Sequence, residues 1–316
     1  MSRGESATFG GETSPLLFYL PLANHLTQSI IGSAHMIQLQ QVDFTYPGQT
    51  APLFDQFNWR VQSGEFWAVI GPSGCGKSTL LHLIVGVRAA NRGTITVNDE
   101  MVPRKKNRGK TGLVLQDYGM LPWATVRENV ALGLRIRRFY GQDDHVDVSS
   151  RKTATKQFPN NREIAPLPAA ASHDTSRVDS WLDRFGLNAL RDKYPAQISG
   201  GQRQRAAIAR TLVLEPDVLL MDEPFSALDA PTREDLEQLT LNLQAETKTT
   251  TVFVTHNIEE AVFLGQRILV LSTPPHSSPV HVVENPGAGR AEYRDELAFA
   301  EKAHELREYL KNNAKT

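Results

Sequence analysis

The sequence has little cysteine, almost no net charge and no long apolar segment. Its single cysteine, Cys75, excludes an intramolecular disulfide and suits a reducing compartment. Lys and Arg number 34 against 35 Asp and Glu, so the chain lacks the basic excess of a dedicated nucleic-acid binder. The longest apolar stretch near the N-terminus, residues 15–23, is too short to cross a bilayer and contains Pro21. We therefore expect a soluble, cytoplasmic chain with no nucleic-acid partner.

From Met36 onward, apolar runs of strand length alternate with segments of helical period. The continuous apolar run over residues 66–70 is typical of a strand buried on both faces of a parallel sheet. Further strands are predicted over residues 37–42, 58–61, 93–97, 113–116, 218–221, 251–254 and 267–271, and helices over 78–87, 180–185 and 202–214. This alternation favours an α/β fold with a mainly parallel sheet.

Three segments lie outside that pattern. Residues 1–35 have no steady period and are either a flexible native tail or a vector-derived extension. Residues 139–178 are polar and proline-rich, and so long that a disordered insertion is expected. Residues 281–316 form a predicted C-terminal helical extension. Its amphipathic helix over 291–310 should pack onto the body through Leu297, Leu306 and Leu310.

A phosphate-binding motif follows the apolar run, with the sequence Gly71-Pro72-Ser73-Gly74-Cys75-Gly76-Lys77-Ser78. Its glycines let backbone amides converge on phosphate oxygens, and the next helix directs its N-terminal dipole at the anion. Lys77 is placed to reach the β- and γ-phosphates, and the Ser78 hydroxyl to ligate Mg²⁺. The same dipole should favour the Cys75 thiolate, which suggests a reactive thiol that reports on nucleotide occupancy.

A second motif, residues 218–223, is an apolar strand that ends in two carboxylates. Beside a phosphate-binding loop, Asp222 is expected near the Mg²⁺ ion and Glu223 on the side of the γ-phosphate. We interpret Glu223 as the base that orients and deprotonates an attacking water.

A third motif, Ile198-Ser199-Gly200-Gly201-Gln202, precedes a basic helix and then Asp222-Glu223-Pro224. Together these motifs resemble the ATP-binding cassette (ABC) family over about residues 36–271. In that resemblance Tyr46 stacks on adenine, Gln116 senses Mg²⁺ or water, Asp229 ends the D-loop 226–229, and His256 is the switch histidine. The resemblance implies a P-loop NTPase (RecA-like) core, an antiparallel β subdomain and a helical subdomain over about 117–204, within an ATPase domain spanning 36–280.

The resemblance also implies ATP and Mg²⁺ as cofactors and a definite set of site residues. The catalytic residues are Lys77, Gln116, Glu223 and His256, and the metal ligands are Ser78, Gln116 and Asp222. Nucleotide contacts come from Tyr46, residues 71–78, Thr79, Ser199, Gly200, Gly201, Gln202 and Asp229. The amides near Ser199 and Gly201 would serve a nucleotide bound by a second copy, so a homodimer with two shared nucleotides is expected.

Downstream of Gln116, the apolar residues Leu121, Pro122 and Trp123 stand on a predicted loop and suggest a docking surface for a partner. This stretch is similar to importers of the nitrate, sulfonate and taurine group. That similarity implies separate membrane permease subunits, a solute-binding protein, and a peripheral place on the cytoplasmic side of the membrane. An exporter or lipid-extracting ATPase is the alternative, and a non-transport ABC ATPase a more distant one.

Overall fold

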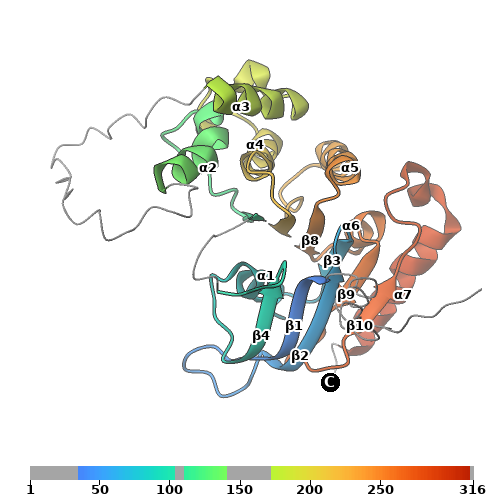
Figure 1. Cartoon of the computed structure of the whole chain (residues 1–316). Coiled ribbons are helices and arrows are strands. Elements are labelled where there is room, and N and C mark those ends of the chain that lie inside the picture. The colour runs from blue at the N-terminus through green and yellow to red at the C-terminus, as the bar shows by residue number, and fades with distance from the viewer. Residues whose placement is uncertain (1–34, 104–109, 141–171, 314–316) are drawn as a thin grey trace, which may run out of the picture. The chain divides into compact units, whose positions relative to one another are not determined.

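The computed structural model describes residues 35–103, 110–140 and 172–313 (Figure 1). The described residues all belong to one compact unit. The expected N-terminal segment, apart from His35, and most of the expected insertion at 139–178 lie outside the described residues. At the end of that insertion the described chain is already helical, because α3 (Ser172–Arg184) begins well before the predicted helix at 180.

A six-stranded sheet forms the centre of the fold, in the order β10-β9-β3-β8-β7-β6. Its strands are β3 (Phe66–Ile70), β6 (Thr111–Val114), β7 (Val218–Asp222), β8 (Thr250–Thr255), β9 (Arg267–Val270) and β10 (His281–Glu284). Five strands pair in parallel, and only β10 is antiparallel to its neighbour β9. All five residues of β3 are buried, as its unbroken apolar sequence predicts. The expected mainly parallel core is confirmed.

A second, antiparallel sheet has the order β2-β1-β4-β5. It consists of β1 (His35–Phe44), β2 (Phe54–Gln62), β4 (Arg92–Val97) and the short β5 (Glu100–Met101). Helix α1 (Lys77–Val85) contacts both β4 and β7, and so joins the two sheets. Alternate side chains of β3 pack there with residues of α1, β1 and β2 into one apolar cluster. The expected antiparallel β subdomain is thus present.

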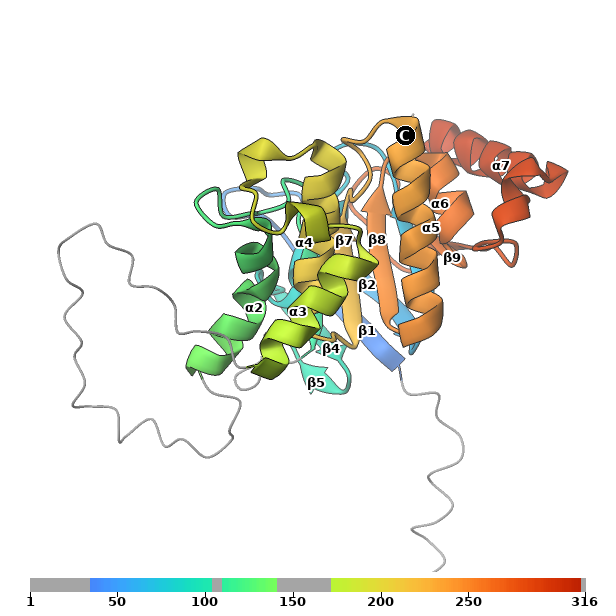
Figure 2. The same ribbon diagram turned by 90° about the horizontal axis from the view of Figure 1, so that it is seen from above.

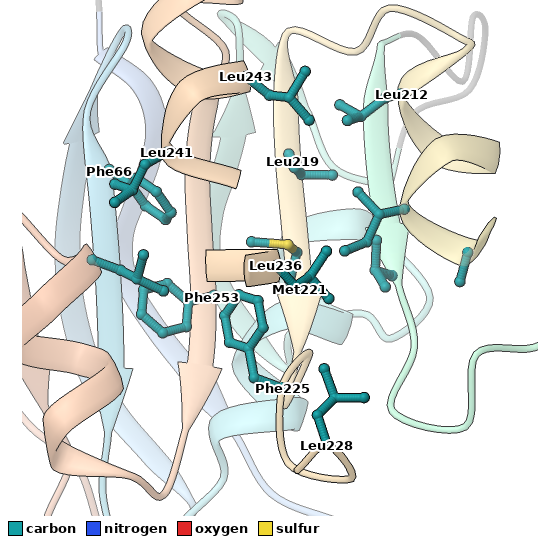
Figure 3. Close-up of a cluster of buried hydrophobic side chains, with 14 of the residues drawn as sticks. Phe66, Leu212, Leu219, Met221, Phe225, Leu228, Leu236, Leu241, Leu243 and Phe253 are labelled. Atoms are coloured by element: carbon teal, nitrogen blue, oxygen red, sulfur yellow. The ribbon is translucent and has the colours of Figure 1, made fainter. Parts of the chain in front are cut away.

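The other face of the six-stranded sheet is covered by α4 (Gly200–Leu212), α5 (Ala230–Thr247) and α6 (Ile258–Leu264). Side chains from β3, β7 and β8 meet those of α4 and α5 in a second buried cluster (Figure 3). Helices α2 (Val126–Tyr140) and α3 pack against α4 and form the helical subdomain (Figure 2). Two short 3₁₀ helices, η2 (Asn188–Leu190) and η3 (Pro195–Gln197), lead from α3 to α4.

The C-terminal segment comprises the 3₁₀ helix η4 (Ala291–Asp295) and α7 (Leu297–Asn313), which packs against α6. Leu306 is fully buried and Leu310 packs against the core, as predicted. The prediction for Leu297 was wrong: this side chain is 74% exposed, because it is the first residue of α7 and points away from the buried face. None of the helices in the described ranges is both long and apolar enough to span a bilayer.

Candidate functional site

The predicted phosphate-binding loop connects β3 to α1, and its backbone requires glycine. Gly74 and Gly76 have φ values of +80° and +101°, in the left-handed region that L side chains rarely adopt. A Cβ on Gly71 would lie 2.4 Å from the carbonyl oxygen of Leu271. The loop therefore wraps tightly at the N-terminus of α1, where the helix leaves its first amides without intrahelical partners.

Lys77 is held against this loop. Its Nζ donates to the carbonyl oxygens of Gly71 at 2.8 Å and Pro72 at 3.1 Å, and the residue is only 7% exposed. The ammonium group is thus fixed at the edge of the loop, where an anion held by the loop amides would meet a positive charge.

Ser78 and Asp222 lie side by side at the ends of α1 and β7. The Ser78 hydroxyl donates to Asp222 Oδ1 at 3.0 Å. Burial raises the pKa of the Asp222 carboxyl, and the hydrogen bond from Ser78 partly offsets that effect. A hydroxyl and a carboxylate are hard oxygen donors of the kind that Mg²⁺ prefers, so this pair fits the predicted metal site.

Glu223 and His256 come together across the carboxyl ends of β7 and β8. His256 Nδ1 and Glu223 Oε2 share a hydrogen bond of 2.9 Å. The histidine side chain is 58% exposed, whereas the glutamate side chain is only 18% exposed. Glu223 has a φ of +46°, and its amide donates to the carbonyl oxygen of Val254. The neighbouring strand therefore fixes the backbone from which this carboxylate projects.

One open cavity of about 490 Å³ gathers most of the predicted site residues. Its lining comprises Tyr46, Leu53, Ser73, Gly74, Gly76, Lys77, Ser78, Thr79, Gln116, Glu223 and His256. Leu53 is the one lining residue that the sequence analysis missed, because an isolated leucine before a strand carries no motif. Gln116 reaches the cavity because β6 ends at Val114, two residues earlier than predicted.

Tyr46 stands at one side of this cavity. Its hydroxyl shares a 2.5 Å hydrogen bond with Thr79 Oγ1, which fixes the ring beside α1. The guanidinium carbon of Arg88 lies 4.9 Å from the ring centroid, a cation–π arrangement that no sequence motif indicated. A planar cationic group thus already lies over the Tyr46 ring.

The prediction of a reactive Cys75 was wrong. The residue is 2% exposed, and burial raises the pKa of its thiol despite the opposing charge of Lys77. Burial disfavours the thiolate more strongly than the nearby positive charge favours it. Cys75 and Pro72 belong to the loop but do not line the cavity.

Residues 199–202 and Asp229 lie outside the cavity lining and instead begin two neighbouring helices. Ser199 is the N-cap of α4: its hydroxyl accepts from the Gln202 amide, and the Gln202 side chain accepts from the Ser199 amide. Asp229 is the exposed N-cap of α5 and accepts from the Thr232 amide. The hydrogen bond with the Thr232 side chain, and to a smaller extent the one from that amide, lowers the pKa of its carboxyl. A Cβ on Gly201 would lie 2.4 Å from the Thr232 side chain, so the two helix starts pack closely.

The backbone of the apolar loop at residues 121–123 is held by hydrogen bonds to a buried asparagine. The side chain of Asn129, which is 1% exposed, accepts from the Leu121 amide and donates to the carbonyl oxygens of Leu121, Ala124 and Thr125. Thr125 and Glu128 form a capping box at the start of α2. The loop is thus preformed, and it leaves Trp123 62% exposed.

Comparison with known proteins agrees with this geometry. The ABC transporter family model matches residues 54–226. An aliphatic sulfonates import ATP-binding protein of Bacillus cereus is 36% identical over 243 residues, which cover 77% of this chain and 82% of that protein. A nitrate import ATP-binding protein of Synechococcus elongatus is 35% identical over 244 residues, covering 77% and 78% of the two chains.

Solved structures similar to this chain are also ATP-binding cassettes. A dimeric ATP-binding cassette in a post-hydrolysis state, bound to ADP and phosphate, is 29% identical, with a TM-score of 0.60. The similarity covers 75% of this chain and 94% of that one. A second dimeric structure, of a bacterial ABC transporter cassette, is 30% identical with the same TM-score and coverage.

Proposed function

Because the chain belongs to the ATP-binding cassette transporter family, we propose that it is the ATP-hydrolysing subunit of an importer for a small solute. The relatives named above import aliphatic sulfonates or nitrate. We place the solute of this system in the same class of sulfonate-, nitrate- or taurine-like molecules. The solute itself would pass through separate membrane subunits.

The observation that supports hydrolysis is the single cavity that joins the phosphate-binding loop to Glu223 and His256. The loop amides and Lys77 would bind the β- and γ-phosphates of ATP. Glu223 would then lie beyond the γ-phosphate, hydrogen-bonded to His256 at 2.9 Å. Tyr46, at the side of the cavity, is the proposed stacking surface for adenine.

The proposed reaction transfers the γ-phosphoryl group to water. Glu223 orients a water molecule and takes one of its protons, while the water oxygen forms a bond to the γ-phosphorus and the bond to the β-phosphate oxygen breaks. The products are ADP and inorganic phosphate. Lys77 offsets negative charge on the β- and γ-phosphates, and His256 holds the Glu223 carboxylate and contacts the γ-phosphate.

Ser78, Gln116 and Asp222 are the proposed ligands of Mg²⁺. Their oxygen atoms are suited to this ion, and the Ser78–Asp222 hydrogen bond already brings two of them together at 3.0 Å. When bound, Mg²⁺ would neutralise charge that builds up on the phosphate oxygens. Gln116 lines the same cavity and would complete the protein ligands.

The active form is proposed to be a homodimer with two ATP molecules at its interface. In a single chain, residues 199–202 and Asp229 do not line the cavity that contains the phosphate-binding loop. The exposed start of α4 can instead present its amides to the γ-phosphate of a nucleotide on a second copy. The dimeric state of the two solved cassettes supports this arrangement.

Leu121, Pro122 and Trp123 are the proposed docking site for a membrane permease subunit. An exposed tryptophan on a loop fixed by Asn129 is the kind of apolar anchor that dominates protein interfaces. Docking there would place the chain at the cytoplasmic side of the membrane, with a solute-binding protein acting on the opposite side.

Two variants test the two halves of this proposal. Trp123→Ala should lose co-purification with the permease while the isolated chain keeps its ATPase activity. Leu297→Ala, which also removes a large exposed apolar side chain, is the matched control and should behave like wild type. Lys77→Ala should lose ATP affinity instead. Normal permease binding by Trp123→Ala would contradict the docking site, and normal ATP binding by Lys77→Ala would contradict the nucleotide site.

A further inference from the structure

Glu260, in the first turn of α6, is a buried carboxylate outside the cavity. It is 4% exposed. Its Oε2 accepts a hydrogen bond from Thr255 Oγ1 at 2.6 Å, and its Oε1 accepts one from Asn257 Nδ2 at 3.3 Å. Thr255 and Asn257 are the two neighbours of His256 in the sequence. One carboxylate therefore holds the backbone segment that carries His256 from both sides.

Arg233, in α5, contacts that carboxylate from another part of the chain. Its Nε lies 3.6 Å from Glu260 Oε1, while its Nη2 donates to the carbonyl oxygen of Leu228 at 2.8 Å. Leu228 belongs to the segment 226–229, and its side chain is buried in the cluster beneath α5 (Figure 3). The guanidinium group thus donates a hydrogen bond to the Leu228 carbonyl and faces the Glu260 carboxylate as an ion pair, with its Nε too far from that carboxylate for a hydrogen bond.

The segment 226–229 is also tied to Glu223. The Ser226 hydroxyl and amide both donate to the carbonyl oxygen of Glu223. Arg233 and Glu260 thus connect the two segments that bear Glu223 and His256, and the side chains of those residues meet at 2.9 Å in the cavity.

We infer that Arg233 and Glu260 form a positioning pair that sets the geometry between Glu223 and His256 for hydrolysis. Neither residue lines the cavity, so the pair acts through the Leu228 carbonyl and through Thr255 and Asn257. This inference rests on the proposed role of His256. It adds two residues, 27 positions apart in the sequence, that no motif of the chain indicated.

If the pair only stabilised the fold, its removal would change the melting temperature and leave kcat unchanged. Buried ion pairs contribute little net stability, so the two roles can be told apart. Removing one partner leaves an uncompensated buried charge, whereas replacing both by apolar side chains of similar size is often neutral. The double variant Arg233→Met/Glu260→Met leaves no unpaired buried charge, although it removes the acceptor of Thr255 Oγ1 and Asn257 Nδ2. It should therefore stay folded, with a lowered melting temperature, and lose the bridge between the two segments.

The decisive measurement is steady-state ATP hydrolysis by the full chain. The double variant should show a kcat at least tenfold below wild type, with a nucleotide affinity within about twofold, since the phosphate-binding loop is untouched. Arg233→Lys keeps a positive charge near Glu260, but its single nitrogen cannot contact Glu260 and the Leu228 carbonyl in the geometry of the guanidinium group. This variant should lower kcat at least threefold. This second variant preserves the test if the double variant does not fold.

The matched control lies one turn further along α5. Glu237 is equally buried, at 1% exposure, and pairs with Arg294 of η4. The charge of Glu237 acts on those of Glu260 and Arg233, but this pair bonds to neither Leu228 nor the neighbours of His256. Glu237→Met/Arg294→Met should therefore hydrolyse ATP at close to the wild-type rate.

Three results would overturn the inference: wild-type kcat in a folded double variant, wild-type kcat in Arg233→Lys, or an equal loss of kcat in the control pair. His256→Ala separates this failure from that of the proposed function. If His256→Ala is slow while the Arg233 and Glu260 variants are fast, only the positioning role fails. If His256→Ala hydrolyses ATP normally, the role proposed for the histidine is wrong, and the positioning role is wrong with it.

Discussion

Replacing Glu223 by glutamine tests the proposed base most directly, because the change removes a proton acceptor and little else. The side chain keeps its size, and its amide can still hydrogen-bond to His256 Nδ1 across the 2.9 Å that separates the two groups. The bond from the Glu223 amide to the Val254 carbonyl oxygen belongs to the backbone and is unaffected. The variant therefore isolates basicity from geometry.

The size of the expected effect follows from the role of the carboxylate. General base catalysis contributes about 10²- to 10⁴-fold, which corresponds to about 2.7–5.5 kcal/mol in the activation barrier. ATP turnover by Glu223→Gln should fall by that factor. ATP binding should survive, because Lys77, Ser78 and Asp222 remain, and the loss of a negative charge near the γ-phosphate favours the bound nucleotide.

Blocked hydrolysis should also trap the dimer. The intact γ-phosphate is the group that both chains are proposed to share, so size-exclusion chromatography with ATP should show a dimer for Glu223→Gln and mostly monomer for wild type. Lys77→Ala serves as the control and should form no such dimer. Wild-type turnover by Glu223→Gln would refute the assignment of the base. An inactive variant that binds ATP but stays monomeric would refute the shared site and leave the base intact.

Three further predictions concern other parts of the chain. Cys75 should react with maleimide at least tenfold more slowly than an exposed cysteine, with or without MgATP, because it is 2% exposed and burial raises its pKa; rapid labelling would contradict this. Burial raises the pKa of Glu237 from 4.5 to about 7, so the folded chain binds this proton more tightly than the unfolded chain. The stability that this group contributes therefore falls by about 3 kcal/mol as pH rises from about 4.5 to 7. Glu237→Gln should flatten the plot of melting temperature against pH over that window, whereas a curve parallel to that of wild type would contradict the assignment. The predicted insertion should be dispensable for hydrolysis: replacing residues 142–170 by a short Gly-Ser linker should leave basal ATPase activity within about threefold, and a hundredfold loss would contradict this.

The elements that could be predicted from the sequence are those in which one simple pattern decides the structure. Strand β3 was predicted to the residue, because an unbroken apolar run can only be buried on both faces. The phosphate-binding loop was predicted because glycine is required at Gly74 and Gly76, where φ is positive. In both places the local sequence and the tertiary structure demand the same residue types.

Prediction failed where tertiary contacts override local pattern. Helix α5 lies outside the predicted elements, because its buried face includes Glu237 and Thr240, which carry no apolar signal. The reactive thiol at Cys75 was inferred from the helix dipole alone, but desolvation is the larger influence on its pKa. Leu297 lies nine residues before the buried Leu306, which is two and a half helical turns, so it falls on the opposite, exposed side of α7.

The buried polar contacts could not be predicted either, and they decide how the site is held. A hydrogen bond such as that between Asn129 and the Leu121 amide joins residues whose types allow many other partners. The same holds for Arg233 and Glu260, which meet only because α5 and α6 cover one face of the sheet. A motif specifies the groups that touch the nucleotide. The distance and orientation between Glu223 and His256 depend instead on residues such as Arg233 and Glu260, which only the folded chain brings together. Variants of these two residues should therefore alter turnover without altering nucleotide affinity.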